Sequence, residues 1–497
     1  MTPKMKWLVS GLLLLAHALA IAIASPAPPR SAHSSPDLDK GSIARNSLEN
    51  EYLIQFHDDP DLSHDQFLAH AAGIHAAAQR FSTTVNQYAG VIRHFNIGSG
   101  FRALHGHLDP EHVEQLKQLD FVKRIEPNGI VTTQFASIPK PAAPPTANLA
   151  LHKTKREDTP SQPNNGTLPP RSRNFNFKVH TRPAQNWGQS RLSHLTPNSP
   201  PKYRHLSPPL PPTIYLLDTG IRASHTEFLL TSISPNSSTS TSSSSSRSKV
   251  RPGPNFTLPP DHPSRHNSST TDQNGHGTHT AATAAGNTFG IVPPHHPVHL
   301  VAVQVFSANG TGTWDGVIEA LQWVGNDTLH RKLGSRAVVN LSLGGGRTEV
   351  VNDAVTAVVR QANVTVVVAA GNDNNLTEYL SPASCPDAIT VAATDRDDAR
   401  AGFSSYGKEV DLFAPGVGIM SAGFGDDHAS VEMSGTSMAA PHVAGLAAYF
   451  MMVYGAHTPD EMRQRLMDVA IKGVVKNKGD GSTDALAYNG IEDDGGS

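Results

Sequence analysis

The sequence predicts an α/β protein in which a parallel sheet carries helices on both faces and a small α+β domain precedes it. The first observation is a set of near-continuous apolar runs separated by helical patterns, which is typical of parallel strands covered on both faces. These runs are Thr213–Leu217, Val298–Val305, Ala337–Ser342 and Asn363–Ala369. The second observation is that residues 51–134 follow the β-α-β-β-α-β order of a ferredoxin-like unit. A chain of 497 residues is long enough for both.

The N-terminus has the pattern of a signal peptide covering residues 1–24. Lys4 and Lys6 precede an apolar run, and Ala22-Ile23-Ala24 supplies small residues at the spacing of a signal-peptidase site. The alternative is a membrane anchor, but the Pro-rich stretch that begins at Ser25-Pro26 favours the signal peptide. Residues 25–50 are expected to be an unstructured leader. No later stretch is expected to span a bilayer, so no membrane association is predicted.

Composition limits the classes of binding partner and the cellular compartments that suit the chain. A net charge of −3 and a pI of about 6.8 argue against a nucleic-acid partner or a polybasic membrane surface. Cys385 is the only cysteine, so no intrachain disulfide can form, which taken alone hints at a reducing compartment. The glycosylation sequons favour the secretory route instead. They begin at Asn165, Asn236, Asn255, Asn267, Asn309, Asn326, Asn340, Asn363 and Asn375. The prediction is a secreted protein, with vacuolar delivery as the alternative.

The small domain can be followed element by element. Asp109 and Pro110 mark the start of its second helix, because Asp is a good N-cap and Pro suits the first helical position. The other predicted elements are a strand at Tyr52–Phe56, a helix around Leu62–Phe81, strands at Gly90–Asn96 and Phe101–Leu108, and closing strands at Val122–Ile125 and Ile130–Thr133.

Two segments have the composition of disordered chain. Residues 135–180 are rich in Pro, Asn and Arg without apolar periodicity, which predicts a linker before a domain at 181–490. The basic cluster Lys153–Arg156 lies within it, and either solvated linker charge or a protease cleavage site explains that cluster. Residues 231–271 are packed with Ser, Thr, Pro and Asn, and are expected to form a disordered surface insertion.

Three short blocks carry complementary chemistry. Asp218 ends an apolar strand, His276 stands before a run of small residues, and Ser437 precedes an apolar helical stretch. A serine hydroxyl needs a base to take its proton, and a buried carboxylate can orient that base. At a helix N-terminus, free N–H groups also favour developing negative charge. His276 and His279 could instead be a metal pair, but the three blocks together predict a catalytic triad.

The chain resembles the subtilisin superfamily, in particular its proteinase K and yeast vacuolar-protease branch. The resemblance rests on Asp218-Thr-Gly220, His276-Gly-Thr-His279 and Gly435-Thr-Ser-Met-Ala439, and it continues through Asn340–Gly346 and Val368–Asn372. Residues 51–134 are similar to the inhibitory propeptide of that family. The resemblance implies a secreted serine endopeptidase made as a zymogen, which acts on proteins or peptides, is inhibited by its own propeptide and is a monomer.

The resemblance also assigns further residues. Asn372 matches the oxyanion-hole asparagine. The residues implied for substrate binding line two walls of a groove: Gly310, Gly312, Trp314, Ser342, Leu343 and Gly344. A structural calcium ion is implied at the carbonyls of Pro386 and Ala388 and the carboxylate of Asp411. The strand Ile130–Thr133 is expected to lead into the groove, with the first cut near Gln134 or Phe135.

Departures from the family pattern support a rival interpretation. The segment between Asp218 and His276 is longer than usual, and Pro208–Pro212 replaces a Gly-rich entry to the first strand. The rival is a catalytically degenerate secreted glycoprotein that keeps the fold and binds peptides. The complete triad together with Asn372 favours the enzyme.

Overall fold

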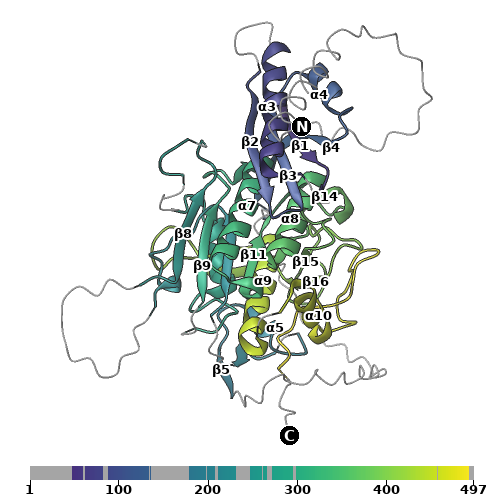
Figure 1. Cartoon of the computed structure of the whole chain (residues 1–497). Coiled ribbons are helices and arrows are strands. Elements are labelled where there is room, and N and C mark those ends of the chain that lie inside the picture. Colours follow the sequence, from purple (N-terminus) through teal and green to yellow (C-terminus); the bar gives the residue numbers. More distant parts are fainter. Residues whose placement is uncertain are drawn as a thin grey trace, which may run out of the picture.

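The computed structural model describes residues 47–491, apart from 60–61, 82–87, 134, 136–177, 198, 207–210, 231–246, 260, 266–270, 295–297 and 456. The predicted signal peptide, the cluster Lys153–Arg156 and most of the predicted linker lie outside the described residues. Figure 1 shows a small N-terminal domain set against the helices of a larger domain.

The N-terminal domain has the predicted β-α-β-β-α-β order. Its elements are β1 (Ser47–Phe56), α3 (His64–Phe81), β2 (Gly90–Ile97), β3 (Phe101–His107), α4 (Pro110–Leu116) and β4 (Val122–Thr133). The sheet is antiparallel, with β1 between β3 and β4 and with β2 on the outer side of β3. The predicted cap of α4 is present, because the Asp109 carboxylate accepts hydrogen bonds from the backbone N–H groups of Glu111 and His112.

The two faces of this sheet serve different purposes. Ile54 and Phe56 pack with α3 and α4 in the domain's own core. Leu53 and Phe95 point the other way and are fully buried in a cluster with the helices of the larger domain. Because side chains alternate along a strand, one small sheet can bury both faces at once.

Two expectations about this domain are corrected. β1 starts at Ser47, inside the predicted leader of residues 25–50, and Ser47 pairs with Gly129. The two closing strands are one continuous strand, β4. Its first part pairs with β1, whereas residues Ile130–Thr133 pair with the larger domain. The strands that pair with the two parts of β4 lie far from it in the sequence. The local sequence pattern therefore could not reveal these pairings.

The larger domain is built on a parallel sheet of seven strands in the order β16-β15-β13-β11-β7-β9-β8. The predicted fold class is confirmed, because helices cover both faces of this sheet. The strands are β7 (Thr213–Asp218), β8 (Val250–Asn255), β9 (His299–Gln304), β11 (Ala337–Leu341), β13 (Thr365–Ala369), β15 (Ile389–Thr394) and β16 (Leu412–Pro415).

Two long helices on one face separate the sheet from the N-terminal domain, and the remaining long helices lie on the other face. The helices of the larger domain are α5 (Trp187–Arg191), α6 (His276–Ala285), α7 (Trp314–His330), α8 (Glu349–Ala362), α9 (Thr436–Tyr454) and α10 (Pro459–Val469). α7 and α8 form the layer against the N-terminal sheet. α6, α9 and α10 contribute to the core on the opposite face.

Shorter elements complete the domain. They are β5 (Val179–Pro183), β6 (Lys202–Leu206), β10 (Thr311–Thr313), β12 (Leu343–Gly346), β14 (Leu380–Ser381), β17 (Ile419–Ala422), β18 (Ser430–Met433), and 3-10 turns at Thr226–Phe228, Gly334–Arg336 and Thr377–Tyr379. β5 begins two residues inside the predicted linker.

The prediction of a disordered insertion at 231–271 is wrong for part of that segment. β8 pairs with β9 at the edge of the parallel sheet. Phe256 and Arg265 follow it and are buried. Pro252 and Pro254 lack the N–H that a central strand needs, but an edge strand tolerates them. Residues 231–246 and 266–270 of the same segment lie outside the described residues.

One helix within the described ranges is long and apolar enough to cross a membrane, although no such stretch was expected after the signal peptide. This helix is α9, and 94% of its apolar window is buried inside the protein. Burial on that scale is typical of the central helix of a folded core.

Candidate active site

The three predicted triad residues lie at the ends of three elements, and two of them, Asp218 and His276, are in direct contact, whereas the Ser437 hydroxyl bonds to Ser342. Asp218 is the last residue of β7, His276 the first of α6 and Ser437 the second of α9. His276 Nδ1 lies 2.7 Å from Asp218 Oδ1, and both side chains are fully buried. Burying a carboxylate is costly unless donors surround it. Here the Thr219 N–H donates to Oδ1 at 2.7 Å and the Thr280 hydroxyl to Oδ2 at 3.0 Å.

Asp272 supports this pair, although the sequence analysis did not identify it. Its Oδ1 accepts the Thr219 hydroxyl at 2.9 Å and the backbone N–H groups of Asn274 and Gly275. Its Oδ2 accepts the N–H and the hydroxyl of Thr278. The buried carboxylate thus joins the turn after β7 to the first turn of α6. An Asp just before a helix start was the available signal.

Ser437 and Ser342 form a reciprocal pair. The Ser437 hydroxyl donates to the Ser342 carbonyl at 3.0 Å, and the Ser342 hydroxyl donates to the Ser437 carbonyl at 2.9 Å. The second bond has a clear cause in the sequence. Pro441 lacks the N–H that would reach the Ser437 carbonyl within α9. α9 begins at Thr436, so Pro441 lies in its second turn.

His276 Nε2 is buried and has no hydrogen-bond partner among the described residues. The ring of Phe135 lies over the imidazole, with 5.7 Å between the ring centroids. Phe135 follows the strand β4 by two positions, so the chain leaving the N-terminal domain passes directly across the triad.

The side-chain amide of Asn372 is held through its oxygen, which leaves its donor nitrogen unpaired within the described part of the chain. Its Oδ1 accepts both the N–H and the hydroxyl of Thr436, each at 2.9 Å. Its Nδ2 is buried without a partner among the described residues. An unpaired buried donor is costly and normally has a functional explanation. Because Thr436 immediately precedes Ser437, the free amide is tied to the N-terminus of α9.

The groove beside the triad is filled by β4. On one side Thr132, Val131 and Ile130 pair with Thr311, Gly312 and Thr313 of β10. On the other side Thr133 and Thr132 pair with Leu343 and Gly344 of β12. Both pairings are antiparallel, so the predicted groove walls each add a strand to the chain between them.

Two glycines at the β10 wall leave room for different neighbours, Gly310 for β4 and Gly312 for the chain that follows β9. Gly310 has φ of +77°, and a Cβ there would lie 2.9 Å from the Thr133 hydroxyl oxygen. A Cβ on Gly312 would lie 2.3 Å from the Val305 carbonyl oxygen. Trp314 is only 3% exposed and belongs to the same buried cluster as Val131.

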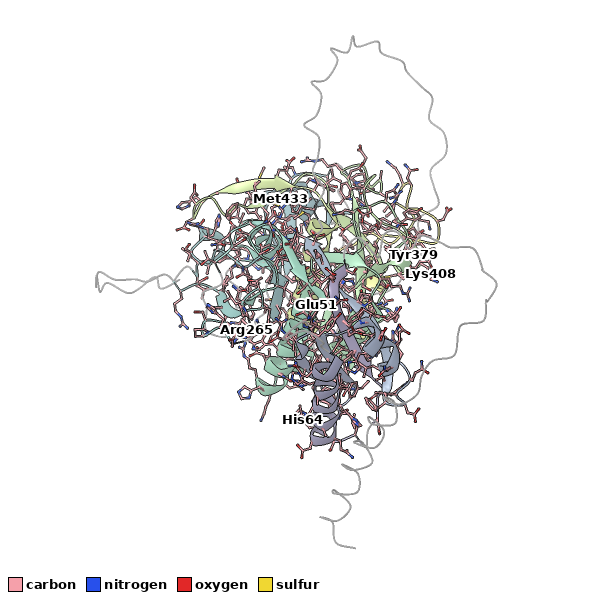
Figure 2. The ribbon with its side chains drawn as sticks, turned by 90° about the horizontal axis from the view of Figure 1, so that it is seen from above. Glu51, His64, Arg265, Tyr379, Lys408 and Met433 are labelled. Carbon is pink, nitrogen blue, oxygen red and sulfur yellow. The ribbon has the colours of Figure 1, made fainter. Side chains whose placement is uncertain are left out.

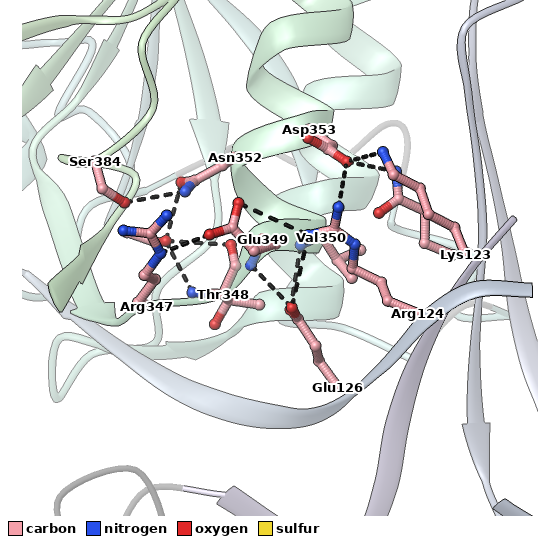
Figure 3. A network of polar contacts seen from close by, with 12 residues as sticks. Lys123, Arg124, Glu126, Arg347, Thr348, Glu349, Val350, Asn352, Asp353 and Ser384 are labelled. Carbon is pink, nitrogen blue, oxygen red and sulfur yellow. Dashed lines mark hydrogen bonds and ion pairs between the residues drawn. The ribbon is translucent and has the colours of Figure 1, made fainter. Parts of the chain in front are cut away.

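Polar contacts fix the N-terminal domain on α8. The Glu126 carboxylate accepts the N–H groups of Glu349 and Val350, each at 3.2 Å, at the N-terminus of that helix (Figure 3). Lys123 Nζ lies 2.6 Å from Asp353 Oδ2. Carboxylates are favoured at helix N-termini because the first N–H groups have no partner within the helix.

A second polar cluster lies at the start of α7. Asp315 accepts a hydrogen bond from Asn128 at 2.8 Å and contacts Arg93, while His105 lies between Asp315 and Glu51. Burial acts to raise the pKa of Asp315, but His105 and Arg93 hold it below its usual value. Glu51 lies toward the middle of the molecule and His64 toward the outer end of the N-terminal domain in Figure 2.

The alternative of a metal pair at His276 and His279 finds no support in their contacts. His279 Nε2 lies 2.9 Å from the Ile419 carbonyl oxygen, whereas His276 faces Asp218. Burial lowers the pKa of His279 to about 3. Within the described ranges, no group of three or more His, Cys, Asp or Glu side chains is placed to hold a metal.

The calcium assignment at Pro386, Ala388 and Asp411 requires correction. The three oxygens do converge, but on the guanidinium of Arg463. Arg463 lies 2.8 Å from Asp411 Oδ1 and 2.7 Å from the Pro386 carbonyl oxygen, and it also donates to the Ala388 carbonyl. A cationic group in hydrogen-bond contact with all three oxygens does not leave them as ligands for a second cation. The residues present therefore do not fit the metal.

A cavity of about 540 Å³ lies away from the triad, between Asn186, Trp187, Arg191, Arg396 and Glu432. The substrate groove is occupied by β4 in this structure.

The fold and this site together define a class of protein, a serine endopeptidase that carries an inhibitory domain at its N-terminal side. The chain belongs to the subtilase family, whose profile matches residues 212–492. A second profile, peptidase inhibitor I9, matches residues 51–134. The N-terminal domain is therefore an inhibitory propeptide, and the protein is a subtilisin-like serine protease made as a zymogen.

Similar proteins agree with this assignment. A "Subtilisin-like protease 3" of Arthroderma benhamiae is 33% identical over 89% of this chain and 91% of its own length. A "Cuticle-degrading serine protease" of Arthrobotrys oligospora is 38% identical over 61% of this chain and 68% of its own. A cold-adapted subtilisin-like serine proteinase of known crystal structure is 33% identical, with a TM-score of 0.53, and its match covers 62% of this chain and 98% of its own. Nothing in these comparisons favours the degenerate binding protein.

Proposed function

We propose that Ser437 is the nucleophile of this endopeptidase, His276 its general base and Asp218 the residue that orients His276. The observation that carries the proposal is the hydrogen bond between fully buried Asp218 and His276, next to a groove that already holds a strand of peptide. In the mature enzyme a substrate strand takes the place of β4 between β10 and β12.

The reaction follows from the chemistry of these groups, once the Ser437 hydroxyl turns from the Ser342 carbonyl toward His276. His276 Nε2 takes the Ser437 proton as the serine oxygen attacks the scissile carbonyl, and the resulting imidazolium is stabilised by Asp218. The free Asn372 Nδ2 donates to the oxyanion, together with the Ser437 backbone N–H at the start of α9. The imidazolium then protonates the leaving amine. Water hydrolyses the acyl-enzyme with the same base and restores Ser437.

We infer that the zymogen makes its first cut beside its own triad. Val131, Thr132 and Thr133 are seated in the groove as a product strand would be, and Phe135 lies over His276. The bond after Gln134 or after Phe135 is then the first one cleaved. The basic pair Lys155-Arg156 offers a later cut to another protease, within the linker proposed for residues 135–180.

Secretion is proposed from the N-terminal signal pattern at 1–24 and from the density of sequons, with vacuolar delivery as the second destination. We also propose that some of the sequons are glycosylated and that the mature enzyme is a monomer. The substrates are proteins or peptides that can adopt an extended strand, because both groove walls pair with backbone groups.

Replacing the nucleophile tests the proposal. Ser437→Ala is expected to leave the full-length precursor uncleaved and to abolish labelling by a fluorophosphonate probe, which reacts only with an activated serine. The matched control is Ser430→Ala, because Ser430 is exposed on β18 and outside the groove. The control should be processed and labelled normally. Turnover by purified Ser437→Ala protein would refute the assignment.

A further inference from the structure

The oxygens of Pro386, Ala388 and Asp411 form a site that a positively charged group already fills. Pro386 and Ala388 directly precede β15, and Asp411 directly precedes β16. Arg463 reaches them from α10, the last helix of the described chain. One side chain therefore links the C-terminal helix to two neighbouring strands at the edge of the sheet.

The planar guanidinium of Arg463 donates hydrogen bonds from both of its terminal nitrogens. One terminal nitrogen donates to Asp411 Oδ1, and the other donates to both backbone carbonyls. The remaining oxygen of Asp411 accepts the Thr390 N–H at 2.8 Å. A planar fork with several donors matches this arrangement, whereas the single ammonium of a lysine would not reach all three oxygens in the same way.

The partly buried position makes the charge balance important. The Asp411 side chain is 15% exposed and that of Arg463 is 29% exposed. Burial raises the pKa of Asp411, and Arg463 and the Thr390 N–H offset only part of this effect. Without Arg463 the carboxylate would be partly desolvated beside two carbonyl dipoles and would need another cation.

The neighbouring carboxylate, Asp387, is already paired with a different arginine. Asp387 lies between Pro386 and Ala388 in the sequence, but its carboxylate contacts Arg360 of α8. Arg360 also lies 2.6 Å from Asp460 of α10. Asp387, Asp411 and Asp460 are thus each paired with one of two arginines, so a divalent ion would have to compete with a guanidinium for every one of these carboxylates.

We propose that Arg463 permanently takes the place of a structural metal ion at this corner, so that the attachment of α10 to β15 and β16 does not depend on calcium. Calcium binds through six to eight oxygens, and the three protein oxygens available here are all used by the guanidinium. The three oxygens still surround a positive charge, as they would in a metal site, but the charge belongs to the Arg463 side chain.

The experiment uses the full-length chain with Ser437→Ala, which prevents self-digestion. Its Tm is measured in 1 mM EDTA and in 10 mM CaCl₂, with 10 mM MgCl₂ as the ionic control. Three changes are compared in this background: Arg463→Ala, Asp411→Asn and the two combined. Arg463→Lys is added as a variant that keeps a positive charge and is the least disruptive to folding.

Arg463→Ala is expected to lower Tm in EDTA by about 3–6 °C, because it leaves Asp411 without a partner. Calcium, but not magnesium, should recover part of that loss, because the vacated oxygens then form an open cation site. The combined variant should show no such recovery, and Arg463→Lys should show a smaller fall with no calcium response. The parent chain and Asp411→Asn should respond to calcium equally.

Two results would overturn the proposal. The first is a fall in the parent's Tm in EDTA that Asp411→Asn removes, because a calcium ion would then be using this carboxylate despite Arg463. The second is an Arg463→Ala variant whose Tm responds to calcium no more than the combined variant does, because the oxygens would then form no cation site once vacated.

Discussion

The register of β4 in the groove gives a prediction that depends on a single residue. Val131 is fully buried in the same cluster as Trp314, while its neighbour Ile130 is 37% exposed. Successive side chains of a strand point to opposite faces, so a slip of one residue would exchange the two positions. Shortening each side chain to Ala therefore reports directly on the register.

The magnitude follows from what each substitution removes. Val131→Ala deletes two buried methyl groups, at about 0.8 kcal/mol each, and the cavity left behind raises the cost to between about 1.6 and 2.5 kcal/mol. At 1.36 kcal/mol for each factor of ten, the propeptide should inhibit about 15- to 70-fold more weakly. Ile130→Ala removes a larger side chain, but one partly in water, and should change inhibition by less than about threefold.

The assay adds residues 47–134 as a separate chain to the mature protease and measures Ki against a chromogenic peptide. Circular dichroism of the parent and variant segments checks that each substitution leaves their secondary structure unchanged. A larger loss from Ile130→Ala than from Val131→Ala would refute the register. No loss from either substitution would show that the strand is held by its backbone alone.

Two further predictions concern the catalytic domain. Asn372→Leu removes the free amide donor and should lower kcat by roughly 10²–10³, a magnitude carried over from the same loss in a subtilisin, with little change in KM; an unchanged kcat with a raised KM would make Asn372 a binding residue instead. His442 is fully buried, and burial lowers its pKa to about 4. Because an unfolded histidine has a pKa of about 6.5, the stability that neutral His442 contributes is complete above pH 6.5 and is lost as the pH falls toward 4, by about 2 kcal/mol at pH 5. Urea unfolding of the Ser437→Ala chain at pH 7 and pH 5 should show this loss, and His442→Gln should reduce the difference by the same amount; an undiminished difference would mean that other groups cause it.

Much of the fold could be predicted because its signals are local. The apolar runs of β7, β9, β11 and β13 lie within one or two residues of their predicted bounds. Asp109 and Pro110 mark the start of α4 through their own backbone preferences. β8 was missed because Pro252 and Pro254 argue against a strand locally, and only the edge position beside β9 makes them acceptable.

Some residues of the candidate site could also be predicted from local sequence, and others could not. Asp218, His276 and Ser437 are recognisable because each stands in a block whose neighbours are also constrained, by a tight turn or by a helix start. The groove walls could be placed by resemblance, and the strand Ile130–Thr133 by its position just before the linker. Asp272 has no such block, and its five hydrogen bonds exist only because β7 and α6 meet at one point.

The sequence by itself determined the class of fold and the order of the two domains, and it supplied the residues proposed to react, since these depend on short-range pattern and residue chemistry. Only the tertiary structure decided which cation sits among Pro386, Ala388 and Asp411. On its own helix, Arg463 is one of several charged residues in a polar stretch and reads as a solvated side chain. Its partner Asp411 is 52 positions away in the sequence, and packing of α10 against the sheet edge brings the two within 2.8 Å. The resemblance implies a metal site at these three oxygens. In the folded chain the Arg463 side chain binds them instead, and no local sequence pattern connects Arg463 to them.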